Sequence, residues 1–259
     1  MAQNKPLILI TNDDGYQSKG IQSLIDSVEG LGEIVVFAPD GPRSGMSSAI
    51  TSGNPIRYSL IKKEESKDLT IYSCSGTPVD CVKLSISEVL SRKPDVLISG
   101  INHGTNAAIC IVYSGTMGAA IEGCIFGVPS IGFSLTDHSA NADFEESKKV
   151  TRAITLQVLE NGLPEGVCLN VNIPDVDHVK GIKICRQTKG QWVKEFVKSK
   201  DGVKRDVYWL TGEFRNDEPE ASDSDEWALA NGYAAVVPSK IDLTAYDMIS
   251  SIKNWEQQF

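Results

Sequence analysis

The chain has 259 residues, of which 41% are hydrophobic and 23% are charged. A chain of this length buries about 70–75% of its unfolded surface on folding. It therefore needs no disulfide or metal to hold it together, and its composition excludes wholesale disorder. The formal net charge is −9, but six acids lie within Asp217–Glu226, a stretch without Lys or Arg. Without those six the chain carries only −3, which argues against a general nucleic-acid-binding surface.

Six cysteines are spread along the chain, and none belongs to a C-x-x-C pair, so a zinc cluster is not expected. Their apolar, strand-like contexts are typical of small buried residues in a reducing compartment. No apolar run approaches the roughly 20 residues of a membrane span, and the N-terminus has no apolar leader segment. We therefore expect a soluble cytoplasmic protein with no membrane contact.

The first two-thirds of the chain alternates predicted strands and helices. Leu7–Ile10 is an apolar run typical of a strand buried on both faces, and helical spacing follows as far as Val28, capped by Ser18. Ile34–Ala38 completes a βαβ unit. Later strands are predicted at Asp95–Ser99, Ser130–Leu135 and Cys168–Ile173, helices at Pro78–Leu90, Ser114–Phe126 and Phe144–Glu160, and a hairpin at Ile56–Ile61 and Leu69–Cys74. This alternation predicts a doubly wound α/β sheet.

After about Ile182 the pattern changes. Lys189–Lys200 and Val207–Phe214 predict a long hairpin, followed by the acidic segment, a strand near Ala234–Val237 and a terminal helix from Thr244 to about Gln257. Appended to a compact core, such elements are expected to be arms that contact other subunits. We therefore expect one domain over residues 1–259, with a core at about 5–185, C-terminal arms at about 186–259, and a homodimer or homotetramer.

Three polar clusters lie beyond the carboxyl ends of predicted strands, which is where ligands of open α/β sheets bind. In Thr11–Gly15, the adjacent Asp13 and Asp14 can face one point because Gly15 lets the backbone turn. Two such close carboxylates repel each other unless a cation lies between them, and their hard oxygens favour Mg²⁺, Mn²⁺ or Ca²⁺ over zinc. Taken alone, the motif is equally well an ordinary turn.

The second cluster is Ser99–Asn106, in which Asn102 and Asn106 offer amide groups and two glycines allow close approach of a ligand. His103 in this loop invites a general-base role, although a lone loop histidine is more often a solvated side chain.

The third cluster, Ser114-Gly115-Thr116, begins a predicted helix, where free N–H groups and the helix dipole bind anions. Simple capping by Ser114 explains it equally well. The loop Pro39–Ser48, with Arg43-Ser44-Gly45, adds a cluster of hydroxyls and a cation after the second strand. Arg43 could clamp a phosphate, but a surface ion pair is the default expectation. Taken together, one site that binds a metal and a phosphate accounts for all of these segments better than four unrelated turns.

These motifs, in this order, resemble the SurE family of survival-protein nucleotidases. The similarity is strong from about residue 6 to 135 and weaker through Asn170–Pro174 to the end. The matching stretches are Thr11–Gly15, Ala38–Asp40 with Arg43–Gly45, Ser75–Val82, Ser99–Asn106 and Ser114–Thr116. A short Asp-Asp-Gly is unspecific by itself, whereas five ordered blocks are highly specific.

The resemblance implies a Rossmann-like, three-layer αβα core with a mostly parallel sheet, and a C-terminal hairpin and end helix used for oligomerisation. It implies a metal-dependent phosphatase that acts on nucleoside 5′- or 3′-monophosphates and, in some relatives, on short polyphosphate. One divalent ion per subunit, Mg²⁺ or Mn²⁺, is implied. The positions that match the family's metal ligands are Asp13, Asp14, Ser44 and Asn102, and those that match its phosphate contacts are Asn106, Ser114, Gly115 and Thr116. The position of His103 varies among relatives, and we interpret the acidic segment Asp217–Glu226 as a solvated loop.

The mechanism we expect is in-line attack of water on phosphorus, with Asp13 and Asp14 as catalytic residues and one of them accepting the proton of the water. One alternative is a covalent aspartyl-phosphate, although haloacid-dehalogenase-like phosphatases carry Asp-x-Asp rather than adjacent acids. Another alternative is a non-catalytic phospho-receiver or nucleotide sensor, since receiver domains also carry paired acids after their first strand.

Overall fold

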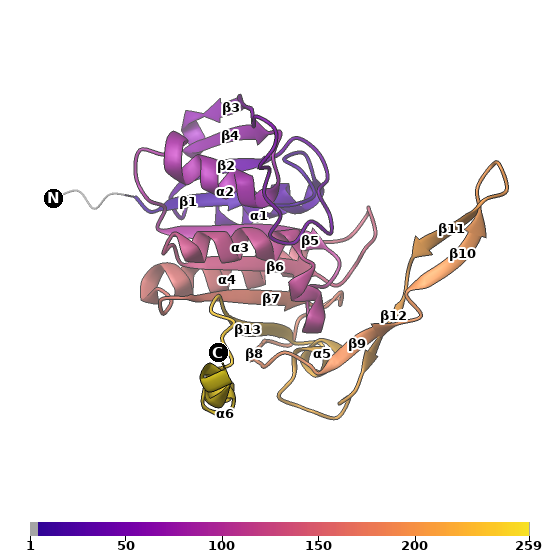
Figure 1. Ribbon diagram of the computed structural model, residues 1–259. Coiled ribbons are helices and arrows are strands. Elements are labelled where there is room, and N and C mark those ends of the chain that lie inside the picture. Colours follow the sequence, from indigo (N-terminus) through magenta and orange to yellow (C-terminus); the bar gives the residue numbers. More distant parts are fainter. Residues whose placement is uncertain (1–4, 259) are drawn as a thin grey trace.

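A nine-stranded sheet forms the centre of the fold, in the strand order β3-β4-β2-β1-β5-β6-β7-β13-β8 (Figure 1). The computed structural model describes residues 5–258. The prediction of no apolar leader falls on Met1–Asn4, which lie outside the described residues, as does Phe259. The strands of the sheet are β1 (Leu7–Thr11), β2 (Glu33–Pro39), β3 (Tyr58–Glu64), β4 (Leu69–Cys74), β5 (Val96–His103), β6 (Ser130–Leu135), β7 (Val167–Ile173), β8 (Ile182–Ile184) and β13 (Ala234–Lys240). All pairs from β4 to β7 are parallel, while β3–β4 and β7–β13 are antiparallel. The prediction of a doubly wound, mostly parallel sheet is confirmed.

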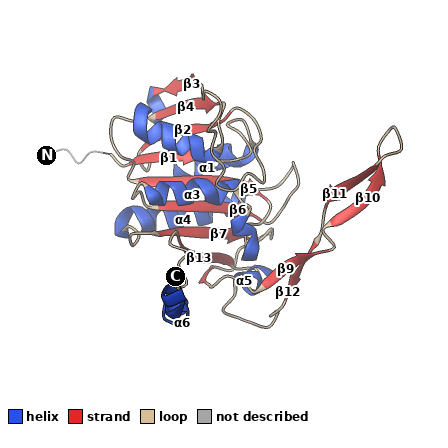
Figure 2. Cartoon of the chain, in the orientation of Figure 1, coloured by secondary structure: helices blue, strands red, loops and turns tan. Residues whose placement is uncertain are grey.

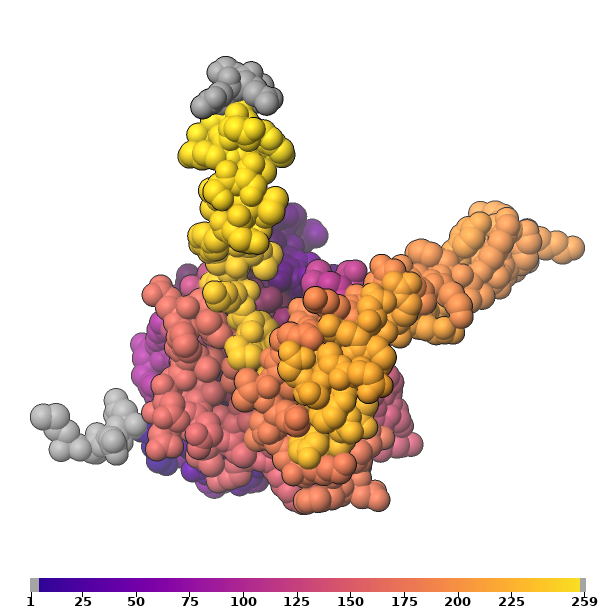
Figure 3. Space-filling model, turned by 90° about the horizontal axis from the view of Figure 1, so that it is seen from below, coloured from indigo at the N-terminus to yellow at the C-terminus, as the bar shows by residue number. Residues whose placement is uncertain are grey.

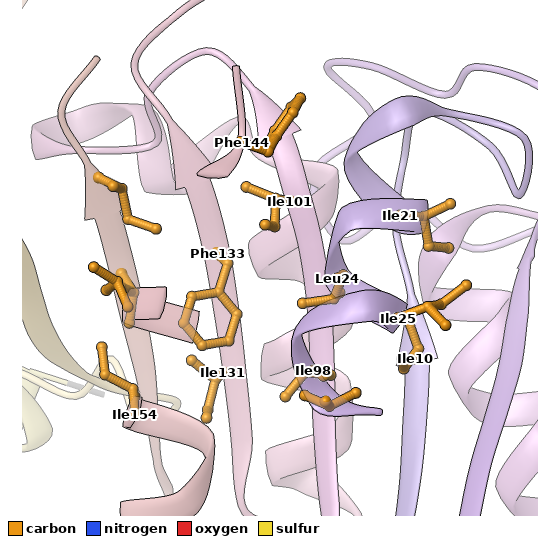
Figure 4. Close-up of a cluster of buried hydrophobic side chains, with 14 of the residues drawn as sticks. Ile10, Ile21, Leu24, Ile25, Ile98, Ile101, Ile131, Phe133, Phe144 and Ile154 are labelled. Carbon is orange, nitrogen blue, oxygen red and sulfur yellow. The ribbon is translucent and has the colours of Figure 1, made fainter. Parts of the chain in front are cut away.

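Helices cover both faces of this sheet because its central strands are apolar on both sides (Figure 2). The helices are α1 (Lys19–Val28) and α4 (Glu145–Asn161) on one face, and α2 (Pro78–Leu84) and α3 (Gly115–Ile125) on the other. Ile10, Ile98 and Ile131 from neighbouring strands pack with Leu24 and Ile154 of the helices in one buried cluster (Figure 4). The predicted three-layer αβα arrangement is thereby confirmed.

The strand order reverses direction between β1 and β5. From β1 the chain crosses through α1 to β2 and continues to β4 on one side, whereas β5, β6 and β7 follow one another on the other side. The loops that leave the carboxyl ends of β1 and β5 therefore diverge, and such a switch point is where ligands of open α/β sheets bind. The first two polar clusters of the sequence lie at this point.

Some predicted boundaries differ from the structure. β5 continues to His103 rather than ending at Ser99, with an irregularity in its pairing between Ser99 and Asn102. The predicted helix from Pro78 divides into α2 and a π-helical turn at Ser85–Val89. All six cysteines are free, and all except the half-buried Cys110 are buried, as predicted.

The interpretation of the acidic segment as a solvated loop is wrong at its end. The short helix α5 (Asp225–Ala230) begins there, and Ser224 and Asp225 have 0% of their surface exposed. The side chain of Ser224 caps this helix by accepting a hydrogen bond from the N–H of Trp227. Composition concealed this burial because the hydrogen-bond donors that satisfy Asp225 come from distant parts of the chain.

A hairpin and a C-terminal helix stand out from the rounded body (Figure 3). The hairpin consists of two antiparallel pairs, β9 (Gly190–Val193) with β12 (Glu213–Asn216) and β10 (Phe196–Lys200) with β11 (Asp206–Leu210). The terminal helix α6 (Tyr246–Ile252) continues into a 3₁₀ segment at Lys253–Gln258. In the described part of the chain, no helix is both long and apolar enough to cross a membrane.

Helix α1 packs so closely on β5 that Gly20 has no room for a side chain. A Cβ atom at Gly20 would lie 2.0 Å from the carbonyl oxygen of Ile101, a backbone atom that cannot turn aside. Alanine favours a helix over glycine by about 1 kcal/mol, but forcing the two elements apart costs about 1–3 kcal/mol. We therefore expect Gly20→Ala to lower the free energy of unfolding, measured by urea denaturation.

The matched control is Gly53→Ala, because a Cβ at Gly53 would meet nothing within 4 Å. This control is expected to leave the unfolding free energy within about 0.5 kcal/mol of the wild type. A Gly20→Ala protein as stable as the wild type would contradict the close packing of α1 on β5.

Candidate active site

The turn after β1 brings two carboxylates to the switch point between β1 and β5. Asn12 closes this turn: its Oδ1 accepts the N–H of Gly15 at 3.1 Å, and its Nδ2 donates to the Gly15 carbonyl at 3.0 Å and to Ser18 Oγ at 2.9 Å. Gly15 has a φ of +96°, a conformation that L side chains rarely adopt. This turn therefore places the adjacent residues Asp13 and Asp14 together at the carboxyl end of β1.

Asp13 lies against the first turn of α3. Thr116 Oγ1 donates a hydrogen bond to Asp13 Oδ1 at 2.5 Å, and only 4% of Asp13 is exposed. The contact is close enough that a Cβ atom at Gly115 would lie 2.9 Å from Asp13 Cβ and 3.1 Å from Asp13 Oδ2. The structure thus joins the first predicted cluster to the third, although they are about a hundred residues apart in the chain.

Burial makes ionisation of both carboxyl groups unfavourable. Burial raises the pKa of Asp13 to about 6; the hydrogen bond from Thr116 opposes this rise, and the neighbouring Asp14 adds to it. The pKa of Asp14 is also raised by burial, and the side chain and backbone amide of His103 oppose that rise. The second cluster therefore lies close to the carboxylate pair as well.

Asn102 and His103 are half-buried at the end of β5. Asn102 Nδ2 donates to the carbonyl of Gly104 at 2.8 Å, which leaves Oδ1 as the atom available to a ligand. His103 Nδ1 lies 3.1 Å from the carbonyl oxygen of Ser139, and its ring packs edge-on against Phe144. The imidazole is therefore held by neighbours rather than free in solvent.

Asn106 is held by a buried amide network that crosses to β7. Its backbone N–H donates to Asn172 Oδ1 at 2.7 Å, its Nδ2 donates to Ser134 Oγ at 2.7 Å, and its carbonyl accepts from Asn170 Nδ2 at 2.8 Å. Asn170 and Asn172 are themselves linked at 2.9 Å and are 1% and 0% exposed. Sequence reasoning assigned these two residues no role; the available signal was a pair of asparagines two positions apart, hence on one face of an apolar strand.

The loop after β2 is held by two backbone carbonyls, one in the turn after β1 and one in the 3₁₀ turn before α3. The N–H of Arg43 donates to the carbonyl of Asp13 at 2.6 Å, and Ser47 Oγ donates to the carbonyl of Val112 at 2.7 Å. The Arg43 guanidinium pairs with Asp40 at 3.0 Å, the surface ion pair expected by default. Ser44 is exposed and directly follows the residue that docks on the Asp13 turn.

Asp80 holds the far end of this loop. Its carboxylate accepts the N–H of Thr51 at 3.1 and 3.2 Å, the Thr51 hydroxyl at 2.6 Å and the N–H of Thr77 at 2.9 Å. Thr77 Oγ1 in turn donates to the carbonyl of Ala49 at 2.7 Å. The Ser75–Val82 motif, noted in the sequence without a role, thus anchors the loop that carries Ser44.

The side chains that could bind a metal ion at this switch point offer oxygen atoms as ligands. Within residues 5–258, no group of three or more His, Cys, Asp and Glu side chains is arranged to hold a metal ion. The loops around the switch point instead carry the carboxylates of Asp13 and Asp14, the amide oxygen of Asn102 and the exposed hydroxyl of Ser44, and such donors suit Mg²⁺ or Mn²⁺. In the described part of the chain, Asp14 Oδ2 is buried without a hydrogen-bond partner. A hard cation at this place would satisfy that oxygen and offset the repulsion of the pair, so the residues present fit one.

Comparisons with known proteins agree over the whole chain. Residues 8–194 match the family model described as "Survival protein SurE". The chain is 56% identical to the 5′-nucleotidase SurE of Phocaeicola vulgatus over 98% of both chains, and 51% identical to that of Bacteroides thetaiotaomicron over 100% of this chain and 99% of the relative. A solved structure, "Crystal Structure of Sure Protein from Aquifex aeolicus", matches with a TM-score of 0.83 at 40% identity, covering 97% of this chain and 100% of that one.

The hydrogen bonds at Asp80 predict a pH-dependent contribution to stability. Burial opposes ionisation of Asp80, but the hydrogen bonds from Thr51 and Thr77 outweigh it and hold the pKa below its ordinary value of 3.8. A carboxyl group with a lowered pKa in the folded state stabilises the fold above the unfolded pKa and loses that effect as the pH falls. We expect Asp80→Asn to lower the unfolding free energy by about 1–3 kcal/mol at pH 7, with a smaller difference from the wild type below about pH 4.

The measurement is urea unfolding of both proteins across that pH range, with the exposed Asp26→Asn as the matched control. A difference between wild type and Asp80→Asn that stays constant with pH would show that the charge of Asp80 contributes nothing.

Proposed function

The chain belongs to the survival protein SurE family and is a 5′-nucleotidase, and we propose that it hydrolyses nucleoside monophosphates at the switch point between β1 and β5 with one divalent metal ion bound per subunit. The observation that carries this placement is the direct contact between Asp13 and the start of α3. It brings a carboxylate suited to a cation next to a helix end suited to a phosphoryl group.

Asp13, Asp14, Ser44 and Asn102 would hold the cation, and Mg²⁺ or Mn²⁺ suits these oxygen donors. The buried, unpartnered Asp14 Oδ2 and the remaining oxygen of Asn102 support this assignment. When bound, such a cation supplies Lewis-acid polarisation of a phosphoryl oxygen and orients water near the phosphorus.

The phosphoryl group would lie against Asn106 and the Ser114-Gly115-Thr116 segment. Ser114 Oγ already accepts the N–H of Met117 at 3.0 Å as the helix cap, so the backbone N–H groups of Gly115 and Thr116 are the donors that remain for an anion. Fixed donors of this kind stabilise the negative charge that grows on phosphoryl oxygens in the transition state.

The reaction is then a direct displacement at phosphorus. The oxygen of water forms a bond to phosphorus as the bond to the nucleoside oxygen breaks on the opposite side. A proton of the water passes to a carboxylate of the Asp13–Asp14 pair. The nucleoside leaves as the alcohol after taking up a proton from solvent, and the carboxylate returns its own proton to solvent. Because every contact invoked is to the phosphoryl group, we extend the proposal to 3′-monophosphates and short polyphosphate.

We further propose that the core at about 5–185 works in a homodimer or homotetramer built through the arms at about 186–259. The arms expose apolar side chains that the body does not cover: Phe196 is 65% exposed, Trp209 66% and Leu243 91%.

The six free cysteines support a reducing, cytoplasmic location for this protein.

The first test is phosphate release from a panel of 5′- and 3′-nucleotides, using metal-stripped protein with Mg²⁺ or Mn²⁺ added back. Asp13→Asn should reduce metal-dependent release at least about a hundredfold, because one negative ligand and its stabilisation of the transition state are lost. Asp26→Asn, an exposed residue of α1 that contacts Gln22, is the matched control and should match the wild type.

Two results would contradict this proposal. The wild-type chain releasing no phosphate with any nucleotide or metal would reject hydrolysis and leave a nucleotide-binding or receiver role. Phosphate trapped covalently on the protein would replace direct attack by water with an aspartyl-phosphate route.

A second test concerns the hydroxyl that supports Asp13. Thr116→Val removes the donor to Asp13 Oδ1 with little change in shape, so the carboxylate is held less firmly. The affinity for Mn²⁺, measured by titration, should fall about 10–100-fold.

Thr151→Val is the matched control, because the buried Thr151 hydroxyl has no hydrogen-bond partner among the described residues and lies on α4. Its Mn²⁺ affinity should equal that of the wild type. Equal affinities of Thr116→Val and the wild type would show that Asp13 does not take part in metal binding through this arrangement.

A further inference from the structure

The fully buried carboxylate of Asp225 lies outside the site described above. Asp225 begins α5 and has 0% of its surface exposed. The nearby cation does not neutralise it: the guanidinium of Arg186 pairs with Glu218 and Asp223 instead. A charge buried in this way is unfavourable unless several hydrogen bonds satisfy it, so its partners indicate what it does.

Four hydrogen bonds converge on Asp225 from three parts of the chain. Its Oδ1 accepts the N–H of Thr188 at 2.9 Å, the Thr188 hydroxyl at 2.5 Å and the N–H of Glu226 at 2.9 Å. Its Oδ2 accepts the N–H of Ala108 at 2.8 Å. Both oxygens therefore act only as acceptors, a requirement that a carboxylate meets and an amide side chain does not.

The bond to Ala108 fixes the loop between β5 and α3. Ala108 has a φ of +51°, a left-handed conformation that is unfavourable for a residue with a Cβ atom. The two preceding N–H groups are also bound: that of Asn106 to Asn172 and that of Ala107 to the Thr105 hydroxyl. Three successive amides are thus held, and Asp225 holds the last of them.

The position of this amide matters because it stands between the two parts of the phosphate site. Asn106 lies two residues before Ala108, and the 3₁₀ turn at Ala108–Val112 leads directly to Ser114, the cap of α3. A shift of Ala108 therefore changes the spacing of Asn106 from the helix start. On its other side Asp225 is bound to Thr188, two residues before the first strand of the hairpin arm.

We propose that Asp225 is a positioning residue for phosphate binding: it holds the loop from Asn106 to Ser114 in its working shape and ties that loop to the root of the hairpin arm. This inference rests on the proposed placement of the phosphoryl group at Asn106 and the start of α3. Asp225 itself does not touch the substrate.

The test is Asp225→Asn in the full-length, metal-loaded protein. The amide should keep its oxygen toward the three donors from Thr188 and Glu226, which places its NH₂ group against the N–H of Ala108 and breaks the loop contact selectively. We expect kcat to fall about 10–100-fold with a smaller change in KM, a weaker affinity for inorganic phosphate by calorimetry, and an Mn²⁺ affinity equal to that of the wild type.

Asp223→Asn is the matched control: it lies in the same segment, is exposed and pairs with Arg186 at 2.8 Å. Its kcat, KM and phosphate affinity should equal those of the wild type. If Asp225→Asn folds and shows unchanged kcat and phosphate affinity, the inference is overturned. A lowered melting temperature with an unchanged kcat per folded molecule would overturn it as well, because Asp225 would then contribute to stability alone.

Thr188→Val decides the question if Asp225→Asn does not fold, because it removes one hydroxyl donor from Asp225 without adding a buried polar group. The loosened carboxylate should lower kcat and phosphate affinity by a smaller factor, and wild-type values for both would overturn the inference. Phosphate binding requires no turnover. If the wild-type chain binds phosphate but releases none from nucleotides, that result contradicts the proposed function. The inference about Asp225 is then still decided by whether Asp225→Asn weakens the affinity for phosphate.

Discussion

Asp13 and Asp14 are adjacent carboxylates at the end of a fully buried strand, and burial raises the pKa of both. Placing two such groups together is unfavourable unless donors and positive charge surround them. The fold meets this requirement from both sides of the switch point: the hydroxyl of Thr116 and the N-terminus of α3 lie on one side, and the backbone amide of His103 on the other. Gly115 permits the approach because any side chain there would displace Asp13. The strand order and the packing of α3 are therefore needed before the pair becomes a site.

The loops around this pair are held by side chains rather than by secondary structure. Backbone N–H groups removed from water need partners, and here buried polar residues from distant elements provide them: Asp80 for Thr51, Asn172 for Asn106, and Asp225 for Ala108. Each of these acceptors stands on a helix or strand of the core or at the root of the arm. Loops that would otherwise be mobile thus acquire the rigidity that orientation of a phosphoryl group requires.

Sequence patterns predicted much of the fold and the principal clusters of the site. Apolar runs such as Leu7–Ile10 predicted buried parallel strands, and the clusters ending in Gly15 and beginning at Ser114 were recognised because turn and cap chemistry is local. The end of β5 was predicted too early because Gly100 and the polar residues after it are typical of a loop, whereas pairing with β6 continues the strand to His103. The acidic segment was misjudged at Asp225 because composition reports charge and not the donors that surround it.

The residues alone determined the order of strands and helices, the caps of α1 and α3, and which side chains carry oxygen donors to the carboxyl edge, since these properties depend on neighbours within a few positions. Only the tertiary structure decided that Asp13 meets Thr116, that Asn170 and Asn172 hold the loop of Asn106, and that Asp225 satisfies Ala108. Those contacts join residues that are 64 to 117 positions apart. No local pattern predicts such pairs, because they form only when the crossing helices and parallel strands pack, and burial then makes each unmet donor or acceptor unfavourable.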